Sequence, residues 1–553
     1  MKRLSAQDAF QEGVDLFQTG DFNGAEASFR LVLKIDPLSP AALNALGTVL
    51  DRLGRSHEAI TAYRNCLKLE PANFIASYNL GNTLRRHGDL QGAESCYRAC
   101  CAMDREFTPA VQALGSLLLE SGRDDEAEEL LLTAANASPP NSDACFNLGT
   151  LSQSRGKLGE AEQWYMRALA NDKNHLQAHN ALGMLCLLDN RIAEAIFCFE
   201  KAVAIKPDYW QAQVNLGIAY AWKGELRKAE ECHESVLRVH PGNGLAHYNL
   251  ALALLAQGSF EKGWREFEWR FEKEENPVPK RHTHIPRWRG EDLEGRSILV
   301  HAEQGYGDTV QFARYLTFLI EQGASVSLEC QDRVISPLMN GLALPLRIFV
   351  RGDVLPGADF QVPLMSLPGI LGPQAWNRPA PPYYLRPDEE SVKEWQRRVA
   401  VHSGLKAGLA WAGRKGHAND HNRSIPGATW RPLAEMENVA FFNLQAGPEH
   451  DTAPPVKLVD YTSLIENLAD TAAIMKNLDL VISVDSAPAH VAGALGIPVW
   501  CLIPYNPDWR WMRDRTDSPQ YPSMRLFRQE RPGGWDDVLR KVQKELLKLA
   551  GGG

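Results

Sequence analysis

Residues 74–100 read FIASYNLGNTLRRHGDLQGAESCYRAC, and the same pattern returns along the first half of the chain every 34 residues. The Leu-Gly pair of this stretch marks the period most clearly. Its glycine belongs to the series Gly13, Gly47, Gly81, Gly115, Gly149, Gly183 and Gly217, which continues as Ala251. A fixed period of this length, sustained from Ala6 to Phe271, predicts a helical hairpin that is repeated and stacked.

Three further positions of the period predict how each hairpin is built. A turn residue separates its two helices, at Gly20, Gly54, Gly88, Gly122, Gly156, Asn190, Gly224 and Gly258. A small residue follows, at Ala25, Ala59, Ala93, Ala127, Ala161, Ala195, Ala229 and Gly263. A bulky residue comes four positions later, at Phe29, Tyr63, Tyr97, Leu131, Tyr165, Phe199, His233 and Phe267. Gly and Asn suit the turn, the small residue lets the helices approach, and the bulky side chain fills the same face.

This pattern resembles the tetratricopeptide repeat over about eight units, which implies an α-solenoid with a concave binding surface over residues 1–272. In that family the sixth position of the first helix faces the groove. Asparagine occupies it at Asn79, Asn147, Asn215 and Asn249, which is similar to the asparagine ladder of eukaryotic O-GlcNAc transferase. An amide both donates and accepts, so we interpret the row as a clamp for the backbone of an acceptor protein. The alternative is a row of soluble groove residues, because other side chains interrupt it at Gln11, Ala45, Ala113 and Ala181.

The second half of the chain alternates strands with helices. It comes after a charged, proline-bearing linker at residues 273–294. Strands are predicted at residues 297–303, 325–330, 346–350, 359–364, 407–411, 440–445, 480–484 and 499–503, and helices at 308–320, 389–401, 468–478 and 487–495. The alternation is typical of parallel sheets. It predicts an α/β fold with two Rossmann-like lobes, residues 295–400 and 401–553, that face a cleft.

The first of three candidate loops comes after the first predicted strand, at the strand end where such folds bind ligands. It contains Gly305, Gly307 and Asp308 but lacks the third glycine of a dinucleotide motif. The glycines would let the loop approach a ligand, and Asp308 would then act as a general base on an acceptor hydroxyl. The alternative is that Asp308 only caps its helix.

The second candidate loop, residues 411–426, is strongly basic for this acidic chain. Arg414 and Arg423 suit phosphate oxygens through charge-assisted hydrogen bonds. His417, Asp420 and His421 could be read as a metal site, but a loop this polar is more often solvated or anion-binding.

The third candidate loop, residues 483–496, joins a strand to a helix that begins near Ala487. The backbone N–H groups and the positive end of the helix dipole form a seat for a diphosphate, flanked by Asp485, Ser486 and His490. The alternative is an Asp/Ser helix cap with a packing histidine.

Together these loops resemble glycosyltransferases of the heptosyltransferase (family 9) type, which have a GT-B fold. They resemble more closely the tetratricopeptide proteins that end in such a domain. The resemblance covers residues 285–529 and includes Asp508-Trp509-Arg510-Trp511. It implies that Asp308 is the catalytic aspartate and that Arg423 contacts phosphate where heptosyltransferases usually have lysine. It also implies that Asp485, Ser486 and His490 form the donor-diphosphate motif.

Composition narrows the partners and the compartment. The 553 residues include 59 Lys+Arg and 68 Asp+Glu, a net charge of −9, which argues against a broad nucleic-acid-binding surface. No Asp-x-Asp motif occurs, so neither a divalent metal nor another cofactor is expected. Met1–Phe10 has no apolar core of signal-peptide length, and prolines interrupt the longest uncharged stretch, residues 486–507. We therefore expect a cytoplasmic protein without a membrane span.

These observations predict a nucleotide-sugar-dependent, inverting O-glycosyltransferase whose repeats recruit an acceptor protein. Flagellin-modifying transferases are similar in build, so flagellin is the first acceptor to test. The sequence does not distinguish a hexose, a heptose and a nonulosonic acid as the transferred sugar. Two alternatives stay open: a repeat scaffold with an inactive transferase-derived domain, and a transferase that acts on lipid or polysaccharide.

Overall fold

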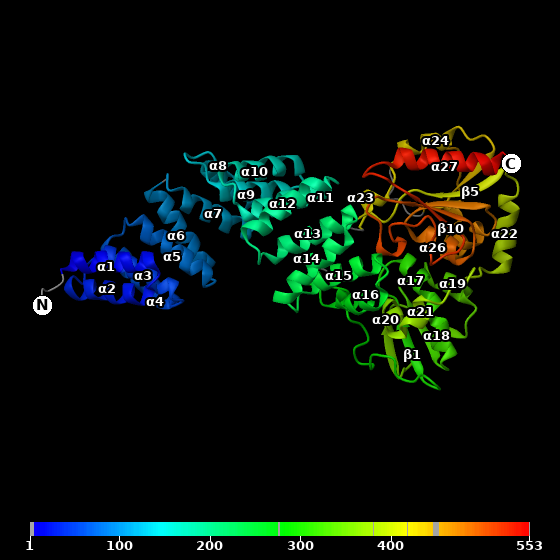
Figure 1. Ribbon diagram of the computed structural model, residues 1–553, viewed down its shortest axis with the longest axis horizontal. Coiled ribbons are helices and arrows are strands. Elements are labelled where there is room, and N and C mark those ends of the chain that lie inside the picture. The colour runs from blue at the N-terminus through cyan, green and yellow to red at the C-terminus, as the bar shows by residue number, and fades with distance from the viewer. Residues whose placement is uncertain are drawn as a thin grey trace. The chain divides into compact units, whose positions relative to one another are not determined.

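The computed structural model describes residues 5–104, 106–274, 277–379, 381–416, 419–445 and 453–551. The chain divides into two compact units (Figure 1), which we call the N-terminal repeat unit (Met1–Pro207) and the C-terminal unit (Asp208–Gly553). The division falls inside the repeat region, well before residue 272. The last two helical hairpins therefore group with the α/β part of the chain.

The N-terminal repeat unit is a series of helical hairpins, which confirms the predicted α-solenoid. Its helices are α1 (Ala6–Thr19), α2 (Phe22–Ile35), α3 (Pro40–Arg52), α4 (Ser56–Leu69), α5 (Phe74–Arg86), α6 (Leu90–Met103), α7 (Thr108–Glu120), α8 (Asp124–Ala135), α9 (Ser142–Ser154), α10 (Leu158–Asn171), α11 (Leu176–Leu188) and α12 (Ile192–Ile205). Each helix packs on the next one along the chain. One apolar core runs from Ala25 to Ala178 through these layers.

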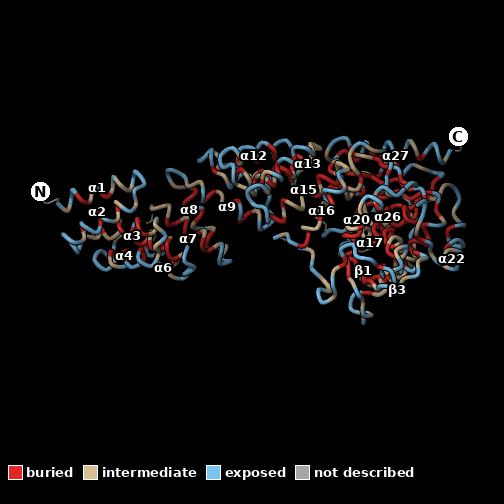
Figure 2. The backbone as a smooth tube through the Cα atoms, turned by 60° about the horizontal axis from the view of Figure 1, so that its bottom comes forward, coloured by how far each residue is buried: buried red, intermediate tan, exposed pale blue. Residues whose placement is uncertain are grey.

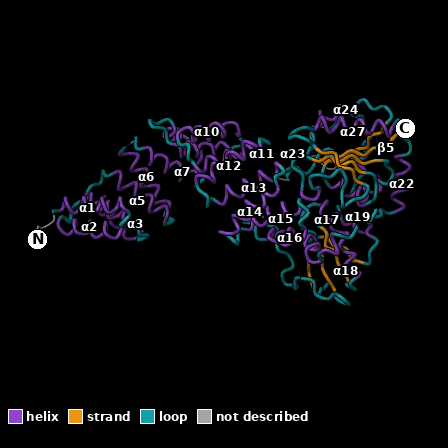
Figure 3. Tube along the Cα trace, viewed as in Figure 1, coloured by secondary structure: helices purple, strands orange, loops and turns teal. Residues whose placement is uncertain are grey.

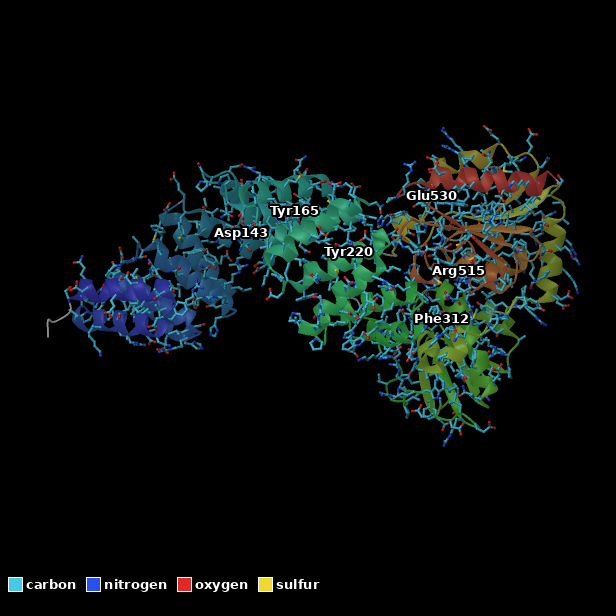
Figure 4. The ribbon with its side chains drawn as sticks, viewed as in Figure 1. Asp143, Tyr165, Tyr220, Phe312, Arg515 and Glu530 are labelled. Carbon is cyan, nitrogen blue, oxygen red and sulfur yellow. The ribbon has the colours of Figure 1, made fainter. Side chains whose placement is uncertain are left out.

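The glycine of each Leu-Gly pair is explained by the bulky residue of its own hairpin. A Cβ atom at Gly81 would lie 2.6 Å from Cε1 of Tyr97, and one at Gly149 would lie 2.5 Å from Cε1 of Tyr165, a ring labelled in Figure 4. Contacts this short do not occur, so only glycine lets the ring lie against the first helix. The predicted turn residues have positive φ, as at Gly88 (84°) and Asn190 (59°).

The last two hairpins belong to the C-terminal unit and are held there by the α/β part. They comprise α13 (Trp210–Lys223), α14 (Leu226–Val239), α15 (Gly244–Ala256), α16 (Phe260–Phe267) and the 3₁₀ turn η1 (Glu268–Phe271). Arg513, far along the chain, donates to the carbonyl oxygens of Ala221 at 2.6 Å and Trp222 at 2.8 Å. These carbonyls belong to the last turn of α13, where carbonyl groups lack the usual helical partner four residues on, so Arg513 caps the helix.

A buried ion pair fixes the end of the repeats to the first sheet. Arg270 is fully buried, and its Nε and Nη2 donate to the two carboxylate oxygens of Glu303 at 2.8 and 3.0 Å. Its Nη2 also donates to Ser366 Oγ at 2.7 Å. The next segment is packed as well, because Trp288 is 1% exposed and its backbone N–H donates to the Gln361 carbonyl at 2.9 Å. The predicted linker at 273–294 is thus attached to the first sheet at Trp288, whereas most of its other described residues are exposed or half-buried.

Two parallel sheets form the α/β part (Figure 3), which confirms the two predicted lobes. The first sheet has the order β3-β2-β1-β4, with β1 (Ser297–His301), β2 (Ser325–Cys330), β3 (Leu346–Val350) and β4 (Phe360–Pro363). The second has the order β10-β9-β8-β5-β6-β7, with β5 (Leu405–Ala410), β6 (Val439–Asn443), β7 (Leu458–Val459), β8 (Leu480–Val484), β9 (Val499–Ile503) and β10 (Met524–Arg528). Central strands β8 and β9 are buried along their whole length, which suits their mainly apolar sequences. Strand β1 is likewise buried from Ile298 to His301 (Figure 2).

Helices cover both sheets. The longer segments are α17 (Tyr306–Phe312), α18 (Leu316–Glu321), α22 (Glu389–Val399), α25 (Leu468–Met475), α26 (Ala487–Ala494) and α27 (Trp535–Ala550). The predicted helix at 308–320 is divided by a 3₁₀ turn, Ala313–Tyr315. Strands β7 and β10 and helix α27 were not predicted. Among the described residues, none of the helices combines the length and the apolar character needed to cross a membrane.

Candidate functional site

The first and third candidate loops meet where α17 packs against α26. Asp308 lies in the first turn of α17, and its Oδ2 accepts the N–H of Gly305 at 2.9 Å. The helix-capping alternative is thus part of the observed structure. The other carboxylate oxygen, Oδ1, is paired with the guanidinium of Arg510. Asp308 therefore joins the end of the first sheet to the second lobe.

Arg510 is the centre of the candidate site. It lies in the 3₁₀ turn η7 (Trp509–Trp511), and its Nε donates to Gln311 Oε1 at 2.7 Å. Its Nη1 lies 2.8 Å from Asp508 Oδ1, so one guanidinium contacts α17 twice and its own turn once. Burial alone would lower the pKa of Arg510, but the carboxylates of Asp508, Asp308 and Asp485 outweigh it and raise that pKa.

The loop after β8 supplies a buried carboxyl and a buried imidazole. Asp485 Oδ1 lies 3.8 Å from His490 Nε2, and a hydrogen bond of 2.9 Å joins His490 Nδ1 to the Tyr521 hydroxyl. Burial and the carboxylate of Asp508 raise the pKa of Asp485 to about 6. Burial and the positive charge of Arg510 lower the pKa of His490 well below its ordinary value, so this imidazole is neutral.

The two glycines of the first loop differ in their surroundings. A Cβ atom at Gly307 would lie 2.7 Å from His490 Cδ2, so this glycine is what allows α17 to approach α26. A Cβ atom at Gly305 would meet only Asp308 Oδ2, at 3.4 Å. In the structure, the close approach at Gly307 is made to His490, and contact of Gly305 and Gly307 with a donor stays a prediction.

The basic loop contributes one of its two predicted arginines to this cluster. Arg423, at the end of α23 (Asp420–Arg423), donates from Nη1 to the Asp485 carbonyl oxygen at 3.1 Å and from Nε to Asp420 Oδ1 at 3.2 Å. Arg414 is exposed. Of the residues read as an alternative metal site, His417 lies outside the described residues. The described part of the chain contains no group of three His, Cys, Asp or Glu side chains suited to a metal ion.

Ser486 and Ala487 stand at the start of α26 as predicted. Ser486 precedes the helix with extended backbone (φ −153°), and its Oγ lies 3.3 Å from Ser483 Oγ and from the Val484 carbonyl oxygen. The helix has eight residues, and Pro488 stands in its first turn. A short helix that starts directly after a buried strand presents its first N–H groups beside Asp485 and Arg423.

The asparagine row is divided between the two units. Asn79 and Asn147 belong to the N-terminal repeat unit, and Asn215 and Asn249 to the C-terminal unit; all four are half-buried. Asn79 Nδ2 donates to Asn44 Oδ1 at 3.2 Å. Asn249 Nδ2 donates to the Leu245 carbonyl of its own helix at 2.9 Å. Two of the four asparagines therefore lie in each unit, and the peptide clamp stays a prediction.

Sequence reasoning missed the role of Arg510 and Gln311 in the site. The sequence connects Arg510 to the site only through the family resemblance, although an arginine between two tryptophans and two positions after Asp508 is an unusual pattern. Gln311 stands one turn after Asp308, which places both side chains on one face of α17. That spacing is the signal that could have found the pair.

Comparisons with known proteins agree with this architecture. Tetratricopeptide repeat profiles match residues 10–64, 44–105, 113–175, 176–209 and 214–263. Glycosyltransferase family 9 (heptosyltransferase) matches residues 449–507, which contain Asp485, Ser486, Ala487 and His490 but not Asp308, Arg423 or Arg510. Protein FlbA of Caulobacter vibrioides is 28% identical over 323 residues, which are 53% of this chain and 54% of FlbA. The chain thus spans about half the length of this curated relative.

Two solved structures illustrate the similarity of the repeats. A tetratricopeptide repeat protein from Parabacteroides merdae is 19% identical, with a TM-score of 0.37, over 45% of this chain and 98% of that chain. PilF of Pseudomonas aeruginosa is also 19% identical, with a TM-score of 0.35, over 37% of this chain and 94% of that chain. The chain thus contains segments between residues 10 and 263 that match tetratricopeptide repeats, and its C-terminal α/β region carries a segment that matches glycosyltransferase family 9.

Proposed function

We propose that the C-terminal unit is a nucleotide-sugar-dependent, inverting O-glycosyltransferase of the GT-B type and that the repeats recruit an acceptor protein. The observation that supports this most is the contact between α17, which carries Asp308, and α26, which lies within the segment matched by family 9. A carboxylate and a helix N-terminus at one place offer a base for the acceptor and a seat for the donor. We place the reaction in the cytoplasm, where nucleotide sugars are made.

The donor phosphates would lie at the start of α26. The N–H groups of Ser486 and Ala487 and the guanidinium of Arg423 offer hydrogen-bond donors there, and the helix dipole favours negative charge. Arg414 is an exposed residue of the basic loop that also carries Arg423, and it can move toward the phosphates. Negative charge develops on the leaving phosphate as the sugar bond breaks, and these groups stabilise it without a metal ion.

Asp308 would take the proton of a Ser or Thr hydroxyl as the hydroxyl oxygen attacks the anomeric carbon. The carbon–oxygen bond to phosphate breaks, the nucleotide leaves with the bonding electrons, and the configuration inverts. Each oxygen of Asp308 keeps a second lone pair beside its bond to Gly305 or Arg510, so the carboxylate can still accept this proton. The ion pair with Arg510 orients the carboxylate for that step.

The test begins with the donor. Calorimetric titration of UDP, GDP, ADP and CMP identifies the nucleotide, and sugars linked to it are then offered with flagellin or with a Ser/Thr peptide library. We expect Asp308→Asn to lower transfer about 100-fold or more, the scale of general-base catalysis, while nucleotide affinity persists. Asp517→Asn, at an exposed aspartate of the same unit, is the matched control.

The outcomes separate the alternatives. Unimpaired transfer by Asp308→Asn removes this residue from the base role. If the protein binds none of the nucleotides and turns over none of the donors, the result supports the alternative of a repeat scaffold with an inactive transferase-derived domain. Transfer only to lipid or polysaccharide supports the alternative of a transferase that acts on those acceptors. Asn147→Ala and Asn79→Ala should weaken binding of the acceptor protein and leave nucleotide binding intact; normal acceptor binding would contradict the clamp.

A further inference from the structure

The last complete hairpin, formed by α15 and α16, packs directly against the candidate site. Helix α15 packs against η7, the turn that carries Arg510. Trp264 of α16 lies edge-on to Trp509 of that turn, with ring centroids 5.2 Å apart, and edge-on to Phe312 of α17 at 5.9 Å. Phe312 is labelled in Figure 4, among the side chains of the C-terminal unit. One repeat hairpin therefore contacts both elements that hold the Asp308–Arg510 pair.

Tyr248 of α15 is a side chain of this hairpin whose surroundings differ from those of the tyrosine at the same position of an earlier repeat. It stands at the same repeat position as Tyr78, five periods earlier. In both hairpins the tyrosine packs on the bulky residue of the period: Tyr78 on Tyr97 with centroids 6.1 Å apart, and Tyr248 on Phe267 at 5.8 Å. The repeat pattern explains these contacts equally well in the two places.

The remaining neighbours of Tyr248 are specific to the C-terminal unit. The ring packs on the core that contains Trp264, Phe267 and Trp509, and the ammonium of Lys273 lies 4.5 Å from its centroid. Burial and the nearby carboxylates of Asp508 and Asp308 raise its pKa to about 12, so the phenol keeps its proton. No hydrogen bond engages its hydroxyl within the described part of the chain, and the side chain is only half-buried.

We propose that Tyr248 positions the acceptor: its hydroxyl donates to the oxygen of the acceptor hydroxyl group and turns that group toward Asp308. The acceptor subsite then lies beside the contact of α15 with η7, and its ligand is a Ser or Thr side chain of a protein segment. The inference rests on the proposed transferase function. It assigns the last complete hairpin to the active site, whereas the hairpins of the N-terminal repeat unit bind the acceptor elsewhere.

The experiment compares Tyr248→Phe with Tyr78→Phe in the full chain. Each change removes one phenol hydroxyl at the same repeat position, so the packing on the bulky residue of the period is matched. The assay measures transfer of the sugar to a Ser/Thr peptide library and, separately, hydrolysis of the same donor without peptide. We expect Tyr248→Phe to lower kcat/KM for the peptides about tenfold or more and to leave donor hydrolysis and donor KM unchanged. Tyr78→Phe should change none of these rates.

Three results would overturn the inference, and the third would also overturn the proposed function. Wild-type transfer by Tyr248→Phe would show that the hydroxyl takes no part. An equal loss of transfer and donor hydrolysis would show that the residue supports the fold or the donor and not the acceptor. A wild-type chain that neither hydrolyses nor transfers any donor would overturn the proposed function together with the inference, whereas the first two results leave that function standing.

Discussion

The hairpins of the N-terminal repeat unit and the last two hairpins of the repeat region share one sequence period but pack against different partners. In the first region each helix packs on its neighbours in the series, and side chains such as Met166 (56% exposed) and Phe197 (57%) remain open to solvent. In the second, Trp264 is 4% exposed because the α/β elements cover it. The same type of repeat can therefore present a solvent-exposed surface or pack against another domain.

The difference shows that a repeat pattern determines a hairpin and not the surface that packs on it. The period places Gly81 against Tyr97 and Gly217 against His233 by the same local geometry. The chain beyond α16 decides the rest, because Arg270 is drawn into the first lobe by Glu303 and Arg513 returns to cap α13. Four changes test this comparison.

The largest effect is expected from Arg270→Met, which removes the ion pair that attaches the repeats to the first sheet. Glu303 would remain buried without a countercharge, and breaking such a pair costs about 3–5 kcal/mol. Tryptophan fluorescence during urea unfolding measures the loss. Trp164 is the only tryptophan before Pro207, so the signal reports almost wholly on the C-terminal unit.

Arg265→Met is the control for this change. Arg265 stands on α16, directly before the turn η1 that carries Arg270. It is exposed and lies 3.9 Å from Glu261, a distance at which a surface pair contributes little. An unfolding midpoint of Arg270→Met equal to that of the control would show that the last hairpins are attached by their apolar contacts alone.

Gly307→Ala should be next in size, with a loss of about 1–3 kcal/mol. The added Cβ would lie 2.7 Å from His490 Cδ2, so α17 and α26 would have to separate. Gly305→Ala offers the matched comparison, because its Cβ would meet only Asp308 Oδ2 at 3.4 Å. Thermal unfolding of both variants checks the prediction, and equal midpoints would contradict the tight contact between the two helices.

Acid should destabilise the C-terminal unit through its buried histidines. Burial lowers the pKa of His233 and His301 to about 3 and that of His490 well below its ordinary value. An unfolded histidine titrates near 6.5, so below that pH the unfolded chain binds protons that the folded unit refuses, and stability falls as the pH falls. Asp485 acts in the opposite sense, because its pKa is raised to about 6, but three imidazoles outweigh it.

We expect the tryptophan signal to report lower urea midpoints at pH 5 than at pH 7. Circular dichroism, which tracks the helices of both units, should then separate into two transitions. A midpoint for the tryptophan signal that does not change between these pH values would show that the imidazoles are not held neutral.

The smallest effect is expected from His233→Phe, which restores the repeat pattern in α14. His233 is buried, and its Nδ1 has no hydrogen-bond partner among the described residues. Phe199 fills the same repeat position against Gly183 without strain. The substitution should therefore raise the free energy of unfolding at pH 7 by about 1–2 kcal/mol, measured by urea titration. A lower midpoint would show that the imidazole makes a contact that phenylalanine cannot replace.

Strongly periodic and strongly buried elements were predictable from the sequence. The turn at Asn190 has the positive φ that its place in the glycine series predicts. Strands β8 and β9 stand at the predicted residues because continuous Val- and Ile-rich runs favour buried parallel strands. Strand β7 has two residues and gives no pattern to detect. Helix α27 was missed, although Val538, Leu539, Val542 and Leu546 form an apolar face at helical spacing.

The candidate site was predictable in its parts. Asp308, Arg423, Asp485 and His490 were each selected from a loop after a strand, since parallel sheets place such loops at one edge. Their contacts could not be foreseen. Asp308 and Arg510 are 202 residues apart, and their pairing depends on how α17 packs against the second lobe.

The sequence by itself determined the repeated hairpin, the two parallel sheets and the loops in which the polar groups stand. Their signals are patterns of residues close along the chain, namely the 34-residue period and strands that alternate with helices, whose spacing the helix and strand periods set. Only the tertiary structure decided that Gly307 makes room for His490, that Arg510 lies among three carboxylates and that the last hairpin packs against the turn that carries Arg510. Each of these depends on the burial of surfaces far apart in sequence, and local spacing does not encode which buried surface meets which.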